Sequence, residues 1–362
     1  MGEYLLEVQD LKTYFKVKAG KVRAVDGVSF AIKPGEKLGV VGESGCGKSV
    51  TALSIMRLLP QPPAEMAGGS VLFEDQDLLD LPESAMQKIR GGKIGMIFQD
   101  PMTCLNPTMT VGKQIGEALR IHLKLSSDES QRRAISLLEQ VGIPAAAQRI
   151  NSYPHQFSGG MRQRVMIAIA LACNPKLLIA DEPTTALDVT VQAQILELIS
   201  GVCNEFGTAV IIITHDLGVV AGMTDRVAVM YAGKVVETAT TDELFANPRH
   251  PYTLGLLSSV PRLDEERHSQ LRTIEGAPPD LLKPPPGCPF MPRCAFAHAI
   301  CRTMPPLEAL PGHSAHLKAC WVDVTDPQQQ AYAEKRRQTR IEKVLAATTS
   351  QSASTQPVRE EM

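Results

Sequence analysis

A glycine-rich run that ends in lysine and serine is the strongest chemical signal in this 362-residue sequence: Gly42-Glu43-Ser44-Gly45-Cys46-Gly47-Lys48-Ser49. It has the pattern G-x-x-x-x-G-K-[ST], follows the apolar segment Lys37–Val41 and precedes a helix-length segment. Backbone N–H groups can wrap a polyphosphate only where glycine lets the chain come close, and a helix N-terminus adds positive potential. We therefore expect Lys48 to contact the β- and γ-phosphates and the Ser49 hydroxyl to bind Mg²⁺. A tight turn without a ligand is the alternative.

Two consecutive carboxylates, Asp181 and Glu182, end a second apolar segment, Leu177–Ala180. A phosphate loop needs a carboxylate on the Mg²⁺ side and a group that activates the attacking water. We expect Asp181 to hold the Mg²⁺ shell and Glu182 to act as the general base. The pair could instead cap a following helix, but Pro183 comes next and disfavours that.

Apolar runs alternate with helix-length segments over most of the chain, which predicts an α/β body. Strands that are apolar on both faces, as in a buried parallel sheet, are expected at Lys37–Val41, Lys93–Phe98, Lys176–Ala180, Ala209–Thr214 and Arg226–Met230. Helices are expected at Ser49–Leu59, Gln131–Val141, Gly160–Cys173 and Val191–Phe206. A second, antiparallel layer is expected from Leu5–Phe15, Lys21–Ile32 and Val71–Phe73.

Charge and hydropathy exclude several classes of protein. The formal charge is −2, from 37 Lys+Arg and 39 Asp+Glu, which argues against a nucleic-acid partner. No apolar run approaches the ~20 residues of a membrane span, and the N-terminal residues lack the pattern of a secretory signal. The chain is therefore expected to stay in the cytosol and not to cross a bilayer by itself.

Between the phosphate loop and the carboxylate pair lies Phe157-Ser158-Gly159-Gly160-Met161-Arg162-Gln163-Arg164. With this order of motifs the chain resembles the ABC ATPases, whose signature is usually written LSGGQ. Phe157 and Met161 depart from it, and Met161 lacks a side-chain amide. The resemblance leaves phosphate recognition to the Ser158 hydroxyl and the amides of Gly159 and Gly160. It implies an ABC-type P-loop domain over residues 1–260 with antiparallel β and helical subdomains, the latter near residues 101–172.

The resemblance also assigns roles to single residues. Gln99 matches the glutamine that senses Mg²⁺ and the membrane partner, Ala186-Leu187-Asp188 the D-loop, and His215 the switch histidine that assists Glu182. An aromatic ring that stacks on adenine is expected at Phe15, with Tyr14 as the alternative. The implied ATP site is Phe15, Gly42, Glu43, Ser44, Gly45, Cys46, Gly47, Lys48, Ser49, Gln99 and Asp181, with Mg²⁺ on Ser49, Gln99 and Asp181. The residues that the resemblance implies contact ATP bound to another subunit are Ser158, Gly159, Gly160, Met161 and Asp188.

Three further segments, Asp100–Pro107, Tyr153–Gln156 and Asn247–Thr253, resemble the ATP-binding subunits of bacterial oligopeptide and dipeptide importers. The resemblance implies an ATP hydrolase that drives peptide uptake from the cytoplasmic face of the inner membrane. Its implied partners are a second ATP-binding subunit in a heterodimer, two permeases and, indirectly, an extracytoplasmic solute-binding protein. Importers of nickel, glutathione or another small solute share these features. A soluble ABC ATPase would need long coiled coils or a second cassette.

Four of the eight cysteines, Cys288, Cys294, Cys301 and Cys320, lie within 33 residues, and ten of the 26 prolines lie between Pro278 and Pro311. Proline excludes regular helix there. The spacing C-x5-C-x6-C-x18-C matches neither common zinc pairs nor ferredoxin runs. The segment also resembles the C-terminal extension of the importer subunits, which points to a [4Fe–4S] cluster. Zinc, with help from His298, His313 or His316, and unligated thiols are the alternatives.

These patterns predict a boundary near residue 261, a small cysteine-bearing domain over residues 261–325, and a tail over residues 326–362 that is helical and then disordered. Because the phosphate loop falls in the other domain, a change at one cysteine is expected to leave nucleotide binding largely intact. An electron-transfer protein is a remote alternative function, since no second redox site is visible.

Overall fold

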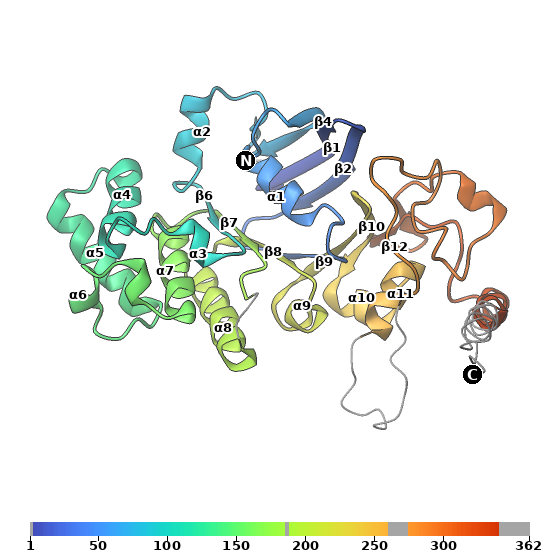
Figure 1. The fold of residues 1–362 in the computed structure, drawn as a ribbon. Helices are drawn as coiled ribbons and strands as arrows, with labels where there is room; N and C mark the ends of the chain where they lie inside the picture. The colour runs from blue at the N-terminus through green and yellow to red at the C-terminus, as the bar shows by residue number, and fades with distance from the viewer. Residues whose placement is uncertain (1–2, 185–187, 260–273, 340–362) are drawn as a thin grey trace, which may run out of the picture.

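The computed structural model describes residues 3–184, 188–259 and 274–339 (Figure 1). The expected domain boundary near residue 261, the D-loop residues Ala186 and Leu187, and the tail beyond residue 339 lie outside the described residues.

An eight-stranded sheet forms the centre of the molecule, in the order β11-β12-β10-β9-β3-β8-β7-β6. Five neighbouring strands of this sheet run parallel: β9, β3, β8, β7 and β6. Their sequences are apolar on both faces, which predicts a buried parallel sheet. The bounds are β3 Lys37–Val41, β6 Ile94–Ile97, β7 Leu177–Asp181, β8 Ala209–Thr214, β9 Arg226–Tyr231, β10 Lys234–Thr240, β11 Glu308–Leu310 and β12 His313–Lys318.

A four-stranded antiparallel sheet lies over one side of this central sheet (Figure 1). Its strands are β1 Leu6–Val17, β2 Gly20–Ile32, β4 Ala64–Phe73 and β5 Gln76–Asp77. β4 is longer than the predicted Val71–Phe73, because Gly69 lets it pair closely with β1: a Cβ there would lie 2.5 Å from the carbonyl oxygens of Gln9 and Asp10. One apolar core, which includes Leu11, Leu38 and Phe73, joins the two sheets.

Helices α3 to α7 form a group at one end of the central sheet (Figure 1), and one apolar core joins α4, α5 and α7 to strands β6, β7 and β8. Their bounds are α3 Pro101–Cys104, α4 Val111–Leu123, α5 Ser127–Gln140, α6 Ala146–Arg149, the short 3-10 turn η1 Pro154–Gln156 and α7 Gly159–Leu171. α5 begins earlier than predicted because Ser126 and Glu129 form a capping box.

The other helices connect strands of the central sheet or flank it: α1 Lys48–Ile55, α2 Glu83–Ile89, α8 Val189–Phe206, α9 Leu217–Met223, α10 Thr241–Ala246 and α11 Pro251–Ser258. The prediction that α1 continues to Leu59 is wrong, because Arg57 takes a left-handed conformation with φ 50°.

The cysteine-bearing segment joins the central sheet directly. As the prolines predict, it contains no α-helix from Pro278 to Pro311, only the 3-10 turn η2 Ala299–Arg302 and β11. β12 pairs with β10, and the buried His316 of β12 contacts the fully buried Glu237 of β10 at 2.7 Å. A third apolar core includes Tyr231, Tyr252 and Phe290. The segment therefore shares a sheet and a core with the body, and a separate cysteine domain is not confirmed. Residues 327–339 are helical.

Candidate functional site

The sheet topology gathers the expected site residues at one edge. The phosphate loop follows β3, Gln99 follows β6, Asp181 ends β7 and His215 follows β8. Since β3, β8, β7 and β6 are parallel neighbours, their carboxyl ends meet at the same edge of the sheet, where α/β proteins bind ligands.

The phosphate loop is closely packed from behind. Gly47 caps α1 with φ 103°, and a Cβ there would lie 2.3 Å from the carbonyl oxygen of Ala24. The ammonium of Lys48 is folded over the loop and donates to the carbonyl oxygens of Gly42 and Glu43, at 2.7 and 3.1 Å. The loop thus holds a buried cation beside backbone N–H groups at a helix N-terminus, an arrangement suited to an anion.

The hydroxyl of Ser49 and the carboxylate of Asp181 face each other on the other side of the loop. The hydroxyl of Ser49 donates to Asp181 Oδ1 at 2.9 Å. Burial raises the pKa of the Asp181 carboxyl; the bond from Ser49 and the charge of Lys48 oppose that shift, and the charge of Glu182 adds to it. A hard cation prefers such oxygen ligands and would offset the cost of burying the carboxylate. The donor set fits Mg²⁺.

Glu182 lies between two exposed side chains from the neighbouring strands. Gln99 Nε2 donates to one of its carboxylate oxygens at 3.0 Å, and His215 Nδ1 lies 3.3 Å from the other. The Glu182 side chain is 14% exposed, and the residue has φ 46°, a strained conformation that tends to occur at functional sites. A carboxylate held in this way can accept a proton from a water molecule.

A cavity of about 410 Å³ opens at this edge of the sheet. It is lined by Ala24, Ser44, Gly45, Gly47, Lys48, Ser49, Val50, Gln99, Glu182 and His215. Six of these lining residues belong to the expected phosphate loop or follow it directly. The other expected ATP-site residues do not line the cavity: Gly42, Glu43, Cys46, Asp181 and, on β1, Phe15.

The two aromatic candidates for adenine stacking have different surroundings. The hydroxyl of Tyr14 donates to Asp26 Oδ1 at 2.6 Å; burial and this bond raise its pKa to about 12. Side chains alternate along β1, so Phe15 lies on the same face as Thr13, whose hydroxyl lies 2.8 Å from that of Ser54 on α1. Phe15 is thus the aromatic residue on the α1 side of β1.

The expected signature residues lie at the start of α7 and do not line the cavity. Ser158 caps this 13-residue helix by accepting from Met161 N at 3.4 Å, and a Cβ on Gly159 would meet no atom within 4 Å. The Met161 side chain packs against the core of the helical group. Asp188 is exposed and caps α8 by accepting from Val191 N. These residues present an open helix N-terminus that a second molecule can approach.

The four clustered cysteines form no disulfides, and they lie close enough for the charges of their thiolates to interact. Burial raises the pKa of the Cys288, Cys294 and Cys320 thiols, that of Cys320 to about 11. Nearby backbone N–H groups partly oppose this rise in pKa at all three thiols. Within the described part of the chain, however, no group of three or more His, Cys, Asp or Glu residues is placed to hold a metal ion.

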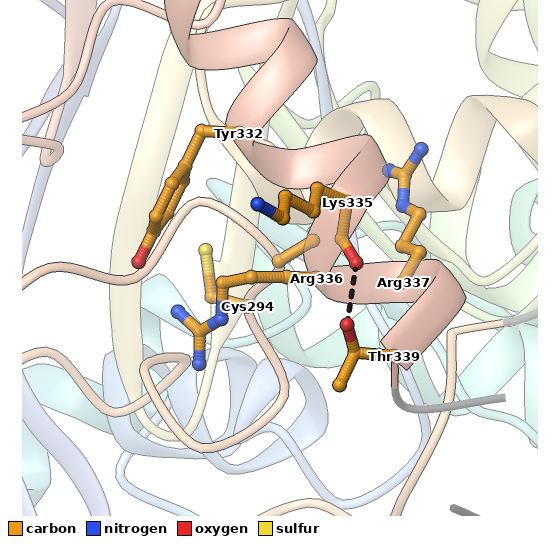
Figure 2. A pocket seen from close by; sticks show the side chains of 7 residues that line it. Cys294, Tyr332, Lys335, Arg336, Arg337 and Thr339 are labelled. Atoms are coloured by element: carbon orange, nitrogen blue, oxygen red, sulfur yellow. Dashed lines mark hydrogen bonds between the residues drawn. The ribbon is translucent and has the colours of Figure 1, made fainter. Parts of the chain in front are cut away.

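Two of the histidines considered as extra zinc ligands are engaged elsewhere. His298 Nε2 lies 2.7 Å from Gln329 Oε1, and its ring stacks on Tyr332 at 4.5 Å. His316 contacts Glu237, as described above. A cavity of about 540 Å³ lies between Cys294 and the helix of residues 327–339, with Tyr332, Lys335 and Arg336 among its lining residues (Figure 2).

Three contacts around the site were not expected from the sequence. The hydroxyl of Tyr252 accepts from the backbone N–H of Glu43 at 2.8 Å, and Gln163 Nε2 donates to the carbonyl oxygen of Pro183 at 2.5 Å. Arg293, from the cysteine segment, forms an ion pair with Glu43 across 250 residues of sequence. Tyr252 and Arg293 fall in segments that resemble the importer subunits, and no local spacing links either to the phosphate loop.

Among the residues that the structure describes, no helix combines the length and the apolar character needed to cross a bilayer.

Comparison with sequence families gives two matches. Residues 25–185 match the family described as "ABC transporter". Residues 236–301 match the family described as "Oligopeptide/dipeptide transporter, C-terminal region". The second match includes three of the four clustered cysteines.

Individual proteins match over most of the chain. The chain is 59% identical to the oligopeptide transport ATP-binding protein OppD of Bacillus subtilis, over 82% of this chain and 83% of that protein. It is 54% identical to the dipeptide transport ATP-binding protein DppD of the same organism, over 88% and 95%. Among solved structures, the dimeric ATP-binding cassette MJ0796 bound to ADP and phosphate is 30% identical, with a TM-score of 0.59 over 65% of this chain and 98% of that chain.

Proposed function

The chain belongs to the ABC transporter family of ATP-binding proteins, and from this premise we propose that it hydrolyses ATP to drive peptide uptake through a membrane importer. The observation that carries the proposal is the convergence of Lys48, Ser49, Gln99, Glu182 and His215 on one cavity at the edge of a parallel sheet. The match to the C-terminal region of oligopeptide and dipeptide transporters, together with the names of the relatives, supports a peptide as the solute.

The polar side chains at and beside the cavity have proposed parts in hydrolysis. Lys48 and the loop amides bind the β- and γ-phosphates, and Ser49, Gln99 and Asp181 would hold Mg²⁺. That ion would supply positive charge to offset the charge that develops on the phosphates. Glu182 orients the attacking water and takes its proton, while His215 helps to hold that water. Phe15 stacks on the adenine.

The second half of the site comes from another subunit. Ser158, Gly159 and Gly160 lie at an exposed helix N-terminus outside the chain's own cavity, so we propose that they cover the γ-phosphate of a partner ATPase. ATP then holds two subunits together and hydrolysis releases them. The groove around residues 99–109 transmits this closure to the permeases.

The proposed assembly provides the second subunit that is needed to complete each nucleotide site. It contains a heterodimer of ATP-binding subunits on two permeases, fed by an extracytoplasmic solute-binding protein, with this chain peripheral on the cytoplasmic face of the inner membrane. We propose residues 1–260 as the cassette, residues 261–325 as its importer extension and residues 326–362 as a tail.

The proposal is tested on the purified importer complex in proteoliposomes. Binding protein loaded with a dipeptide or an oligopeptide should stimulate ATP hydrolysis several-fold over unloaded binding protein. Stimulation by nickel or glutathione alone would reassign the solute. ATP hydrolysis by the isolated chain that no permease affects would favour a soluble ABC ATPase; the longest described helix, α8 with 18 residues, gives no support to the coiled coils such proteins need.

We also propose that Cys288, Cys294, Cys301 and Cys320 ligate a [4Fe–4S] cluster. The support is the set of four thiols whose charges interact with one another, together with backbone N–H groups that favour the thiolate form of three of them. Anaerobically purified protein should contain about four irons per chain, and a serine at any one cysteine should lower that content. One zinc per chain would favour a structural zinc site, and metal-free active protein would reduce the cysteines to buried thiols.

A further inference from the structure

The cysteine segment reaches the back of the phosphate loop through one side chain, Arg293. Its Nη1 and Nη2 donate to the two carboxylate oxygens of Glu43, at 2.5 and 2.9 Å. Nη1 also donates to the hydroxyl of Tyr231 at 3.3 Å, Nη2 to the carbonyl oxygen of Ile274 at 3.0 Å, and Nε to that of Glu275 at 3.0 Å. All five N–H donors of the guanidinium therefore have an acceptor.

The surroundings of Arg293 favour arginine over any other cation. Its side chain is 5% exposed and lies 5.8 Å from the ring of Tyr231 and 5.9 Å from that of Phe290. A lysine could neither form the two parallel bonds to Glu43 nor stack a planar group on these rings. A buried guanidinium whose N–H groups are all hydrogen-bonded fixes the carboxylate that it pairs with in one position.

Glu43 is the second residue of the phosphate loop and is held at three points. Its carboxylate pairs with Arg293, its N–H donates to Tyr252 and its carbonyl oxygen accepts from Lys48. A carboxylate at this position places a negative charge in the loop that receives the polyphosphate. Without a counter-charge, that carboxylate would repel the phosphates in a partly dry environment, where charges are weakly screened.

We propose that Arg293 is a positioning residue for nucleotide binding: it neutralises and fixes Glu43, and so couples the cysteine segment to the phosphate loop. The inference rests on the proposed ATP site. It also revises the expectation that changes at the cysteines leave nucleotide binding intact, because Arg293 immediately precedes Cys294 and a disordered cysteine segment would withdraw it from Glu43.

The test measures the dissociation constant of MgATP by calorimetry on the full-length chain. Arg293→Gln should raise it about tenfold, because the Glu43 carboxylate loses its counter-charge. Arg293→Lys should give an intermediate value, since the charge remains but the two parallel bonds do not. Adding Glu43→Gln to Arg293→Gln should restore binding to within about threefold of wild type, because no unpaired carboxylate then remains.

A matched control comes from the opposite edge of the same sheet. Arg226, at the start of β9, donates from Nε to Glu36 Oε1 at 2.8 Å, and both side chains are largely buried. Arg226→Gln should lower the melting temperature by breaking this pair but leave the dissociation constant of MgATP unchanged. The comparison separates a loss of fold stability from an effect on the loop.

Linkage gives a second readout that does not depend on ATP hydrolysis. If the two regions are coupled, nucleotide must stabilise the cysteine segment in return. MgADP should slow amide hydrogen exchange in residues 286–302 of the wild type, but not of Arg293→Gln.

Three results would overturn the inference. Arg293→Gln could bind MgATP as tightly as wild type, or the double variant could bind as weakly as Arg293→Gln alone. Either would refute the action of Arg293 through Glu43 and leave the ATP site intact. A wild-type chain that binds no MgATP would instead refute the proposed function, and this inference with it.

Discussion

Replacing Glu182 with glutamine removes the proposed base while keeping the size of the side chain. In the structure the carboxylate accepts a hydrogen bond from Gln99 Nε2 at 3.0 Å, and its other oxygen lies 3.3 Å from His215 Nδ1. The amide oxygen of a glutamine can still accept from one of these neighbours, but it cannot take a proton from water at neutral pH. Lys48, Ser49 and Asp181 are untouched, so the phosphate and Mg²⁺ contacts should remain.

The expected magnitudes follow from these contacts. Loss of a positioned general base lowers kcat by about 10²- to 10⁴-fold, which corresponds to about 3–5 kcal/mol in the activation barrier. The stability change is far smaller, because the side chain keeps its size and one acceptor atom, and loss of the hydrogen bond from an exposed partner costs about 1 kcal/mol. In a chain of this length, a melting temperature lower by about 1–2 °C would accompany that loss. Glu182→Gln should therefore bind ATP, hydrolyse it very slowly and accumulate as an ATP-bound pair of subunits.

The assay compares ATP hydrolysis by the assembled complex with equilibrium binding of MgATP, for wild type, Glu182→Gln and Glu74→Gln. Glu74 is the matched control, since it pairs with Lys93 and Lys176 just before β6 and β7, at the opposite edge of the same sheet. Glu74→Gln should keep the wild-type kcat. Hydrolysis by Glu182→Gln at near wild-type rate would refute the assignment of the base, and loss of MgATP binding would show that Glu182 belongs to the binding site instead.

The remaining predictions concern three other residues of the site. Lys48→Ala should weaken MgATP binding itself, by at least tenfold in the dissociation constant, because the cation that faces the phosphates is lost; unchanged affinity in calorimetry would contradict this. His215→Ala should lower kcat about 100-fold with little change in melting temperature, since its side chain is 63% exposed; a large fall in melting temperature with retained turnover would show a packing histidine. Asp181→Asn should stop Mg²⁺-dependent hydrolysis yet stabilise the nucleotide-free chain. Burial raises the pKa of Asp181, so its favourable contribution is present at low pH and is lost as the pH rises through that pKa. The variant should melt about 2 °C above wild type at pH 8, with a gap that narrows towards acid pH; an equal or lower melting temperature at pH 8 would contradict the burial argument.

Local pattern was sufficient to predict the parallel strands and the residues at their carboxyl ends. Lys37–Val41 and Ala209–Thr214 were predicted with the bounds that β3 and β8 have, because buried parallel strands are apolar on both faces. Parallel neighbours then bring Glu182 and His215 together without any further information.

Contacts between distant segments could not be predicted in this way. Tyr252 and Arg293 meet Glu43 across 209 and 250 residues, and no periodicity in the sequence encodes such a pairing. The length of β4 also depends on a partner strand, since Gly69 disfavours a strand by itself and becomes useful only where β1 approaches. The union of the cysteine segment with the central sheet depends on pairing between β12 and β10 in the same way.

The central claim, that this chain couples ATP hydrolysis to peptide uptake, is tested most directly by transport itself. Proteoliposomes that contain the complete importer, with ATP enclosed on the side of this chain, are supplied with binding protein and a radiolabelled peptide. We predict peptide accumulation inside the vesicles with wild-type chain and only background accumulation with Glu182→Gln. Equal accumulation with both chains, or none with wild type although the complex hydrolyses ATP, would contradict the claim.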